Sequence, residues 1–211
     1  MNILPTSQLV FQRQFIAAII GCNLEVGETV SYTLQDFCAE IHEILVAENN
    51  ADGREKVHQK LEQLLGNETF IEQFCGPDKP EGVYKLNEDP TTGAVVLCHV
   101  MGEGAMSPPH DHGASWAIYG QATEHTVMRE WYRTDDGSDD EDISLEKNSE
   151  YRLDPGQVGL FNPGVIHSIE YPDNARFVRV TGVDLDRIDR KAYNLKHKSV
   201  KTIRAASADA A

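Results

Sequence analysis

The spacing of apolar residues changes once along the chain. In the first part, apolar side chains recur every three or four residues, as on one face of an amphipathic helix. This spacing predicts helices over residues 6–20, 34–47 and 54–65. A short further helix is predicted around Phe70–Phe74. Thr33 is placed to cap the second helix, which supports its start at residue 34.

From Gly82 onward the pattern is that of short β-strands. Apolar and polar residues alternate or run together briefly, and turn-forming residues separate the runs. Strands are predicted over residues 83–86, 94–101, 116–119, 124–133, 143–145, 150–153, 158–161, 167–171 and 176–181. Many short strands at regular spacing favour a sandwich or barrel of the jelly-roll kind.

One domain is expected, because 211 residues are a usual length for a single domain. It would consist of three consecutive parts. Residues 1–78 are expected to form a helical region packed on the barrel, and residues 79–195 the barrel itself. Residues 196–211 lose most apolar side chains, which predicts a frayed, flexible tail.

Charge and cysteine content restrict the class of protein. The formal net charge of −15 argues against binding to nucleic acids and to anionic membranes, since both attract basic surfaces. Part of this charge lies in the segment Asp135–Asp142, with six acids in eight residues, which we interpret as a solvated hairpin loop. No C-x-x-C pair, signal peptide or apolar run of membrane length is present. We therefore expect a cytoplasmic protein with free thiols.

Two histidine-containing segments carry the candidate chemistry. His110 and His112 stand two residues apart, so on a strand they would share one face and reach the same metal ion. Further on, a Pro163-Gly164 turn precedes His167, which begins another predicted strand. Three histidines from two strands suit a metal site that keeps open positions for other ligands.

The two segments resemble the two sequence motifs of the cupin superfamily. The first motif opens with Gly104, which five residues separate from the His-x-His pair, and the second with Gly156, ahead of the turn. The glutamate that usually follows the pair would fall at Trp116 or Ala117 and is missing. A cupin that keeps three histidines without this glutamate is most similar to the cysteine dioxygenase-like, or thiol dioxygenase-like, proteins. The resemblance covers residues 80–185 and is looser before them.

This resemblance implies a metal-dependent dioxygenase. Its fold would be mainly β, a cupin jelly-roll (double-stranded β-helix) barrel with an N-terminal helical region. Fe(II) would be held by His110, His112 and His167, with Zn, Ni or Mn as alternatives. The reactants would be O2 and a small thiol or acid, and the protein would be a monomer or homodimer.

Arg179 is the candidate for binding the substrate. It alternates with Phe177 and Thr181 on a predicted strand, so the three side chains share one face. If this face looks into the barrel, Arg179 is a buried cation that requires an anion, such as a substrate carboxylate or Glu130. The Ser-x-His-x-Tyr set of many thiol dioxygenases would align with this strand, and its three residues are absent here.

Other residues near the motifs have simpler interpretations. Arg129 and Arg133 can bind substrate or form surface ion pairs. Glu124 or His125 can add a fourth ligand. His99 lies within an apolar run and is expected to be a core histidine with its hydrogen bonds satisfied. Four aromatic residues can line the site but are expected in the core: Trp116, Tyr119, Phe161 and Tyr171.

Two rival functions remain open at this point. The first is a cupin metalloenzyme of another class, such as a carbon–carbon cleaving dioxygenase, a lyase or an isomerase, that uses its metal as a Lewis acid. The second is a cupin that binds a small molecule without converting it. The metal ligands would be the same three histidines in each case.

Overall fold

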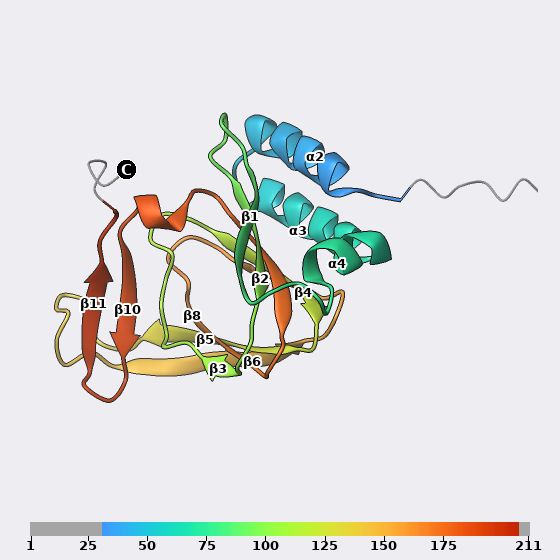
Figure 1. Ribbon diagram of the computed structural model, residues 1–211. Helices are drawn as coiled ribbons and strands as arrows, with labels where there is room; N and C mark the ends of the chain where they lie inside the picture. The colour runs from blue at the N-terminus through green and yellow to red at the C-terminus, as the bar shows by residue number, and fades with distance from the viewer. Residues whose placement is uncertain (1–30, 207–211) are drawn as a thin grey trace, which may run out of the picture. The chain divides into compact units, whose positions relative to one another are not determined.

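A computed structural model describes residues 31–206, of which residues 32–206 belong to one compact unit. The helix predicted over residues 6–20 lies outside the described residues. Within the described part, three helices precede the strands (Figure 1). The helices are α2 (Leu34–Ala47), α3 (Ala51–Leu65) and α4 (Glu68–Cys75). None of them is both long and apolar enough to cross a membrane.

Each helix begins at a side chain that caps it. Thr33 forms a capping box with Asp36: each side chain accepts a hydrogen bond from the backbone N–H of the other residue. The predicted range of this helix, residues 34–47, is confirmed at both ends. The side chain of Asn50 accepts from the N–H of Gly53 and starts α3 at Ala51, three residues earlier than predicted. The prediction missed this start because the run from Asn49 to Gly53 has the composition of a loop.

The two larger antiparallel sheets have the strand orders β1-β2-β9-β4-β7 and β3-β8-β5-β6. The strands of the first sheet are β1 (Gly82–Glu88), β2 (Val95–Val100), β4 (Ala117–Thr123), β7 (Val158–Phe161) and β9 (Arg176–Thr181). Those of the second are β3 (Ala105–Met106), β5 (Thr126–Arg133), β6 (Leu145–Leu153) and β8 (Ile166–Tyr171). A mainly β fold with N-terminal helices was the expectation, and it is confirmed.

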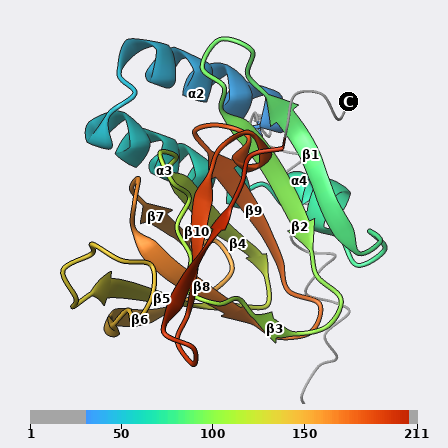
Figure 2. The ribbon, with the colours of Figure 1, turned by 90° about the vertical axis from the view of Figure 1, so that its left-hand side faces the viewer.

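The first sheet separates two apolar cores. Its outer face packs against the helices, where Val178 and Val180 of β9 belong to one core with Phe37 and Leu61. The helices lie along this face in Figures 1 and 2. Its inner face packs against the second sheet in another core: Ala117, Tyr119, Met128, Leu153, Phe161, Ile169 and Phe177. Because side chains alternate along a strand, Arg179 shares the inner face with Phe177, as predicted.

The prediction of a flexible tail is wrong for residues 199–203. The strands β10 (Arg190–Asn194) and β11 (Ser199–Ile203) form an antiparallel hairpin that crosses in front of β8 (Figure 2). Tyr193 anchors it in a small core with Ile143 and Ile166. These partners are distant in sequence, and the hairpin is half exposed, so its own composition carries little apolar signal. A short 3-10 helix, η1 (Leu185–Arg187), precedes the hairpin.

Two other local predictions also require correction. The His-x-His pair lies outside the regular strands, and His110 forms isolated bridges to His167 and Ala192. The two short strands predicted over residues 143–145 and 150–153 are a single strand, β6, with a register shift against β5 between Glu130 and Trp131. Irregular pairing of this kind is set by the partner strand and not by the local pattern.

Candidate metal centre

The three predicted ligand histidines come together. His110 and His112 lie on the segment between β3 and β4, and His167 lies on β8. Their ring centroids are 4.5 Å apart for His110 and His167, 4.8 Å for His112 and His167, and 5.3 Å for His110 and His112. One nitrogen from each ring lies within 4.8 Å of the other two. The cluster can therefore hold one metal ion.

Backbone carbonyl groups orient two of these rings. Nδ1 of His110 lies 3.0 Å from the carbonyl oxygen of Pro108, and Nδ1 of His167 lies 3.2 Å from that of Val165. A carbonyl only accepts hydrogen bonds, so each Nδ1 carries the proton and each Nε2 has a free lone pair. Nε2 of His167 is buried and has no hydrogen-bond partner. This arrangement fits a metal ligand, since such an ion would satisfy the buried nitrogen.

The histidines are held in the neutral form that binds metals. Burial lowers the pKa of His167 to about 3, and it also lowers the pKa values of His110 and His112. The Arg179 guanidinium adds to this effect at all three rings. Three neutral imidazoles without a carboxylate form a site suited to Fe, Zn, Cu or Ni.

Aromatic side chains enclose the cluster on the side of the inter-sheet core. The Phe161 ring stacks on His167, with centroids 4.2 Å apart and planes 16° from parallel. The fully buried Tyr119 places its hydroxyl 3.5 Å from Nε2 of His112. Tyr119 and Phe161 therefore contact the site as well as filling the core. Trp116, in contrast, belongs to the core under the helices, and Tyr171 packs near Phe177.

Asp111 fixes the His-x-His segment from behind. Its buried carboxylate accepts hydrogen bonds from the N–H of Gly113, the N–H of Lys191 and the hydroxyl of Tyr193. These distances are 2.9, 3.0 and 2.9 Å. The residue between the two histidines thus connects their backbone to the β10–β11 hairpin.

A cavity of about 400 Å³ contains the candidate substrate-binding residue, Arg179. Nε of Arg179 is buried without a hydrogen-bond partner, and the residue has no ion pair within the described part of the chain, including with Glu130. Arg190 also lines this cavity, and its charge contributes to the lowered pKa values of His110 and His112. Arg190 was not predicted from the sequence, because it lies beyond the last predicted strand.

His99 lines the same cavity and differs from the prediction. Its ring stacks on Phe177 at 4.7 Å, but its buried Nε2 has no hydrogen-bond partner. Burial first, and Arg179 second, lower its pKa to about 3. The expectation of a satisfied core histidine is therefore wrong. A larger cavity of about 620 Å³, lined by residues such as Trp131 and Leu195, includes neither His99 nor Arg179.

The alternative ligands and cations lie elsewhere. Arg129 forms ion pairs with Glu150 and Glu170, and Arg133 pairs with Asp135 at the start of the acidic loop. Glu124 is exposed in a turn, and neither it nor His125 joins the three histidines. Within residues 31–206 no second group of three His, Cys, Asp or Glu side chains is placed to hold a metal.

Comparisons with known proteins give distant structural neighbours. No family model and no curated protein matches the chain. The cupin domain of Cnp3 from Schizosaccharomyces pombe has 12% identity and a TM-score of 0.37, covering 51% of this chain and 66% of that one, just under two thirds. A cupin superfamily protein from Desulfitobacterium hafniense has 13% identity and a TM-score of 0.35, and the match covers 51% of this chain and 84% of that one. An oxalate oxidase bound to glycolate has 17% identity and a TM-score of 0.34, and the match covers 49% of this chain and 51% of that one.

Such low scores carry no functional inference. The two antiparallel sheets, and the histidines placed where the two motifs predict them, agree with the architecture that the sequence resemblance implies. Fold and site together define a mainly β protein with a three-histidine cluster that can bind a metal ion.

Proposed function

We propose that the protein is a non-haem Fe(II) dioxygenase that oxidises a small thiol or acid with O2, as the likeness to the cysteine dioxygenase-like proteins implies. The observation that carries this proposal is the set of three neutral histidines without a carboxylate. A divalent ion bound to neutral ligands keeps its full charge, which favours anionic co-ligands such as a thiolate. When bound, the iron would supply the activation of O2.

The surrounding residues would bind and orient the substrate. Arg179 has a buried guanidinium nitrogen without a partner and would pair with the anionic end of the substrate. Phe161 and Tyr119 form an aromatic wall against His167 and His112 that limits the access of water from the core side. A site with little water strengthens the attraction between the substrate anion and the cations around it.

The same three histidines also suit a Lewis-acid metal, which is the main rival. Zn, Ni or Mn bound there would polarise a carbonyl or hydroxyl group and support a lyase or isomerase reaction. The identity of the metal therefore separates the two functions more directly than any single residue does.

The test is the metal content of anaerobically purified protein, followed by oxygen-electrode assays with a panel of small thiols and acids. We expect about one equivalent of iron, lost in His110→Ala, His112→Ala and His167→Ala. His197→Ala is the matched control, since His197 is exposed in the β10–β11 turn. Substrate-dependent O2 uptake by the iron form would support the proposal. Zn, Ni or Mn at full occupancy without O2 uptake would support the Lewis-acid rival, and no metal after reconstitution would contradict both.

A further inference from the structure

Two buried polar atoms without partners belong to residues that line one cavity. Nε2 of His99 and Nε of Arg179 both lack hydrogen-bond partners, and both residues line the cavity of about 400 Å³. His99 is only 8% exposed. Buried polar groups are almost always hydrogen-bonded, so two unsatisfied ones on the same cavity require an explanation. Stacking on Phe177 accounts for the position of the His99 ring but leaves its Nε2 unexplained.

The strand register makes the two side chains neighbours. In the pairing of β2 with β9, His99 is opposite Phe177 and Leu97 is opposite Arg179. His99 and Arg179 are therefore diagonal neighbours on the inner face, roughly 7–8 Å apart between Cα atoms. At this separation their side chains can reach two atoms of one small group.

The chemistry of the pair selects that group. Arginine can only donate hydrogen bonds, so the atom that it contacts must be an acceptor. His99 is neutral because burial lowers its pKa to about 3, and a neutral imidazole has one N–H to donate. A carboxylate offers two acceptor oxygens and the negative charge that offsets Arg179.

We infer that Arg179 and His99 together bind one carboxylate group, each through one of its oxygens, and that the ligand has no ammonium group beside it. This deepens the proposed function, since it names the substrate as a simple carboxylate and His99 as a residue that determines specificity. This inference and the proposed function can be tested separately, because the carboxylate contacts do not involve the metal ligands.

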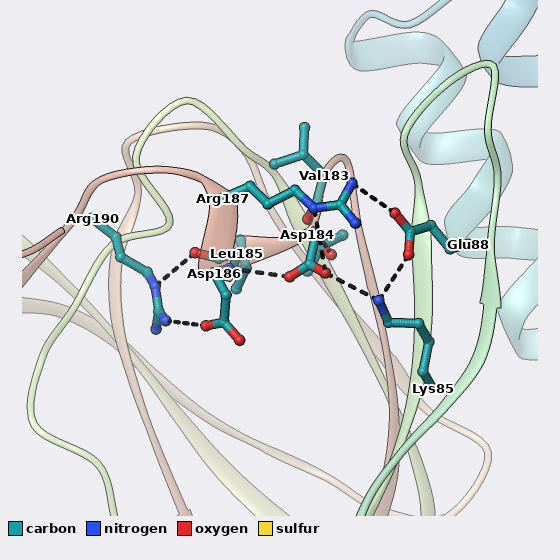
Figure 3. A network of polar contacts seen from close by, with 9 residues as sticks. Lys85, Glu88, Val183, Asp184, Leu185, Asp186, Arg187 and Arg190 are labelled. Atoms are coloured by element: carbon teal, nitrogen blue, oxygen red, sulfur yellow. Dashed lines mark hydrogen bonds and ion pairs between the residues drawn. The ribbon is translucent and has the colours of Figure 1, made fainter. Parts of the chain in front are cut away.

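The exclusion of an ammonium group follows from the ion pairs around the cavity (Figure 3). Two carboxylates line it, and each already has a cation: Asp184 pairs with Lys85 at 3.1 Å, and Asp186 pairs with Arg190 at 2.9 Å. Arg187, outside the lining, pairs with Glu88 at 2.9 Å. Among the charged residues of this lining, Arg179 is the cation left without an ion-pair partner. An ammonium group would therefore enter a site with no free anion.

The remaining walls indicate a short hydrocarbon chain on the ligand. Val95, Leu97 and Leu185 line the same cavity between the charged groups. The volume lies at the lower end of the range found for small-molecule sites. A carboxylate with a few carbon atoms would fill it better than a sugar acid or a nucleotide.

The experiment uses the full chain freed of metal with a chelator, so that binding is measured independently of oxygen chemistry. Propionate, its neutral analogue propionamide, and alanine, which adds an ammonium group, are titrated by calorimetry. We expect propionate to bind at least tenfold more tightly than either of the others. Undetectable binding of propionate, or equal binding of alanine, would overturn the inference.

Substitutions then identify the two residues. His99→Phe keeps a flat ring on Phe177 and removes the donor, and Arg179→Met removes the charge. Each is expected to weaken propionate binding at least tenfold. His99→Gln restores a donor and should recover binding to within about threefold of the natural protein. Arg152→Met is the control, because Arg152 is exposed and pairs with Asp154.

Each result bears on one of the two proposals. If His99→Phe binds propionate as well as the natural protein does, His99 is not part of the site. If His99→Phe weakens binding and His99→Gln fails to restore it, the role of His99 is packing and the inference is wrong. Iron content measured on parallel samples that keep their metal tests the proposed function alone, because neither His99 nor Arg179 is a predicted metal ligand.

Discussion

The backbones of His110 and His167 hydrogen-bond to each other in both directions. The N–H of each residue donates to the carbonyl oxygen of the other, and both distances are 2.8 Å. This pair of bonds joins the irregular His-x-His segment to β8. Two of the three candidate ligands are therefore held in register by main-chain contacts, which substitution of their side chains leaves in place.

This relationship predicts that loss of one histidine side chain removes the metal site without unfolding the protein. In metal-free samples we expect His110→Ala to change the free energy of unfolding by no more than about 1–2 kcal/mol. Added metal should raise the melting temperature of the natural protein and of His197→Ala, because binding to the folded state alone stabilises it. His110→Ala should show no such rise. A variant that is unfolded before metal is added would mean that the cluster is structural.

Asp111 should matter for both stability and metal affinity. Asp111→Ala leaves two backbone N–H groups and the Tyr193 hydroxyl without their acceptor, which we expect to cost about 2–4 kcal/mol in urea unfolding. Tyr193→Phe removes one of the three bonds and should cost about 1 kcal/mol. Metal affinity should fall in Asp111→Ala more than in Tyr193→Phe, because Asp111 lies between His110 and His112. Equal affinities in the two variants would refute this role.

The buried His99 should make stability depend on pH. Its pKa is about 3 in the folded protein and about 6.5 in an unfolded chain. Between these values the unfolded chain binds a proton that the folded protein does not, so stability rises with pH. The contribution of His99 to the free energy of unfolding is fully present above pH 6.5. It is lost as the pH falls toward 3, by up to about 1.4 kcal/mol per pH unit.

Urea unfolding of metal-free protein between pH 4.5 and 7.5 measures this dependence. The natural protein contains other buried histidines, among them His167, so its slope includes several groups. The difference in slope between the natural protein and His99→Gln isolates the contribution of His99. The variant should show the shallower dependence of stability on pH. Parallel curves for the two proteins would contradict the prediction.

Gly120 should not tolerate a larger side chain. A Cβ added at Gly120 would lie 2.7 Å from Cδ1 of Leu65 and 2.9 Å from Cδ2 of Leu61, where α3 packs on β4. We expect Gly120→Ala to cost about 1–3 kcal/mol through overpacking. The double variant Gly120→Ala with Leu65→Ala should lose less than the sum of the two single changes, since it removes one of the clashing atoms. Strict additivity in thermal unfolding would exclude this explanation.

The local parts of the structure were the most predictable from the sequence. The caps of α2 and the strands β7 and β9 depend on residues within a few positions, so spacing was sufficient to place them. The histidine cluster was predictable for another reason: the motif spacing and the Pro163-Gly164 turn identify the two segments that bring the three histidines together. Whether the three residues bind a metal stays a prediction.

The missed features depend on contacts between distant segments. His99 lies diagonal to Arg179 because β2 pairs with β9 in a register that sets His99 opposite Phe177, and no local pattern encodes this register. The β10–β11 hairpin was missed because the partners of Lys191 and Tyr193, which are Asp111 and Ile143, come much earlier in the chain. Such contacts are tertiary and override the weak preferences of a short polar segment.

The connection from Asp111 to the hairpin has a consequence for biosynthesis. The segment that carries His110 and His112 is completed only when Lys191 and Tyr193 are present to engage Asp111. A nascent chain on the ribosome that has released residues up to β9 would possess all three histidines and still lack the support that positions two of them. Metal loading is therefore expected to follow synthesis of the hairpin, so the ion would enter a nearly finished protein and would not guide its early folding.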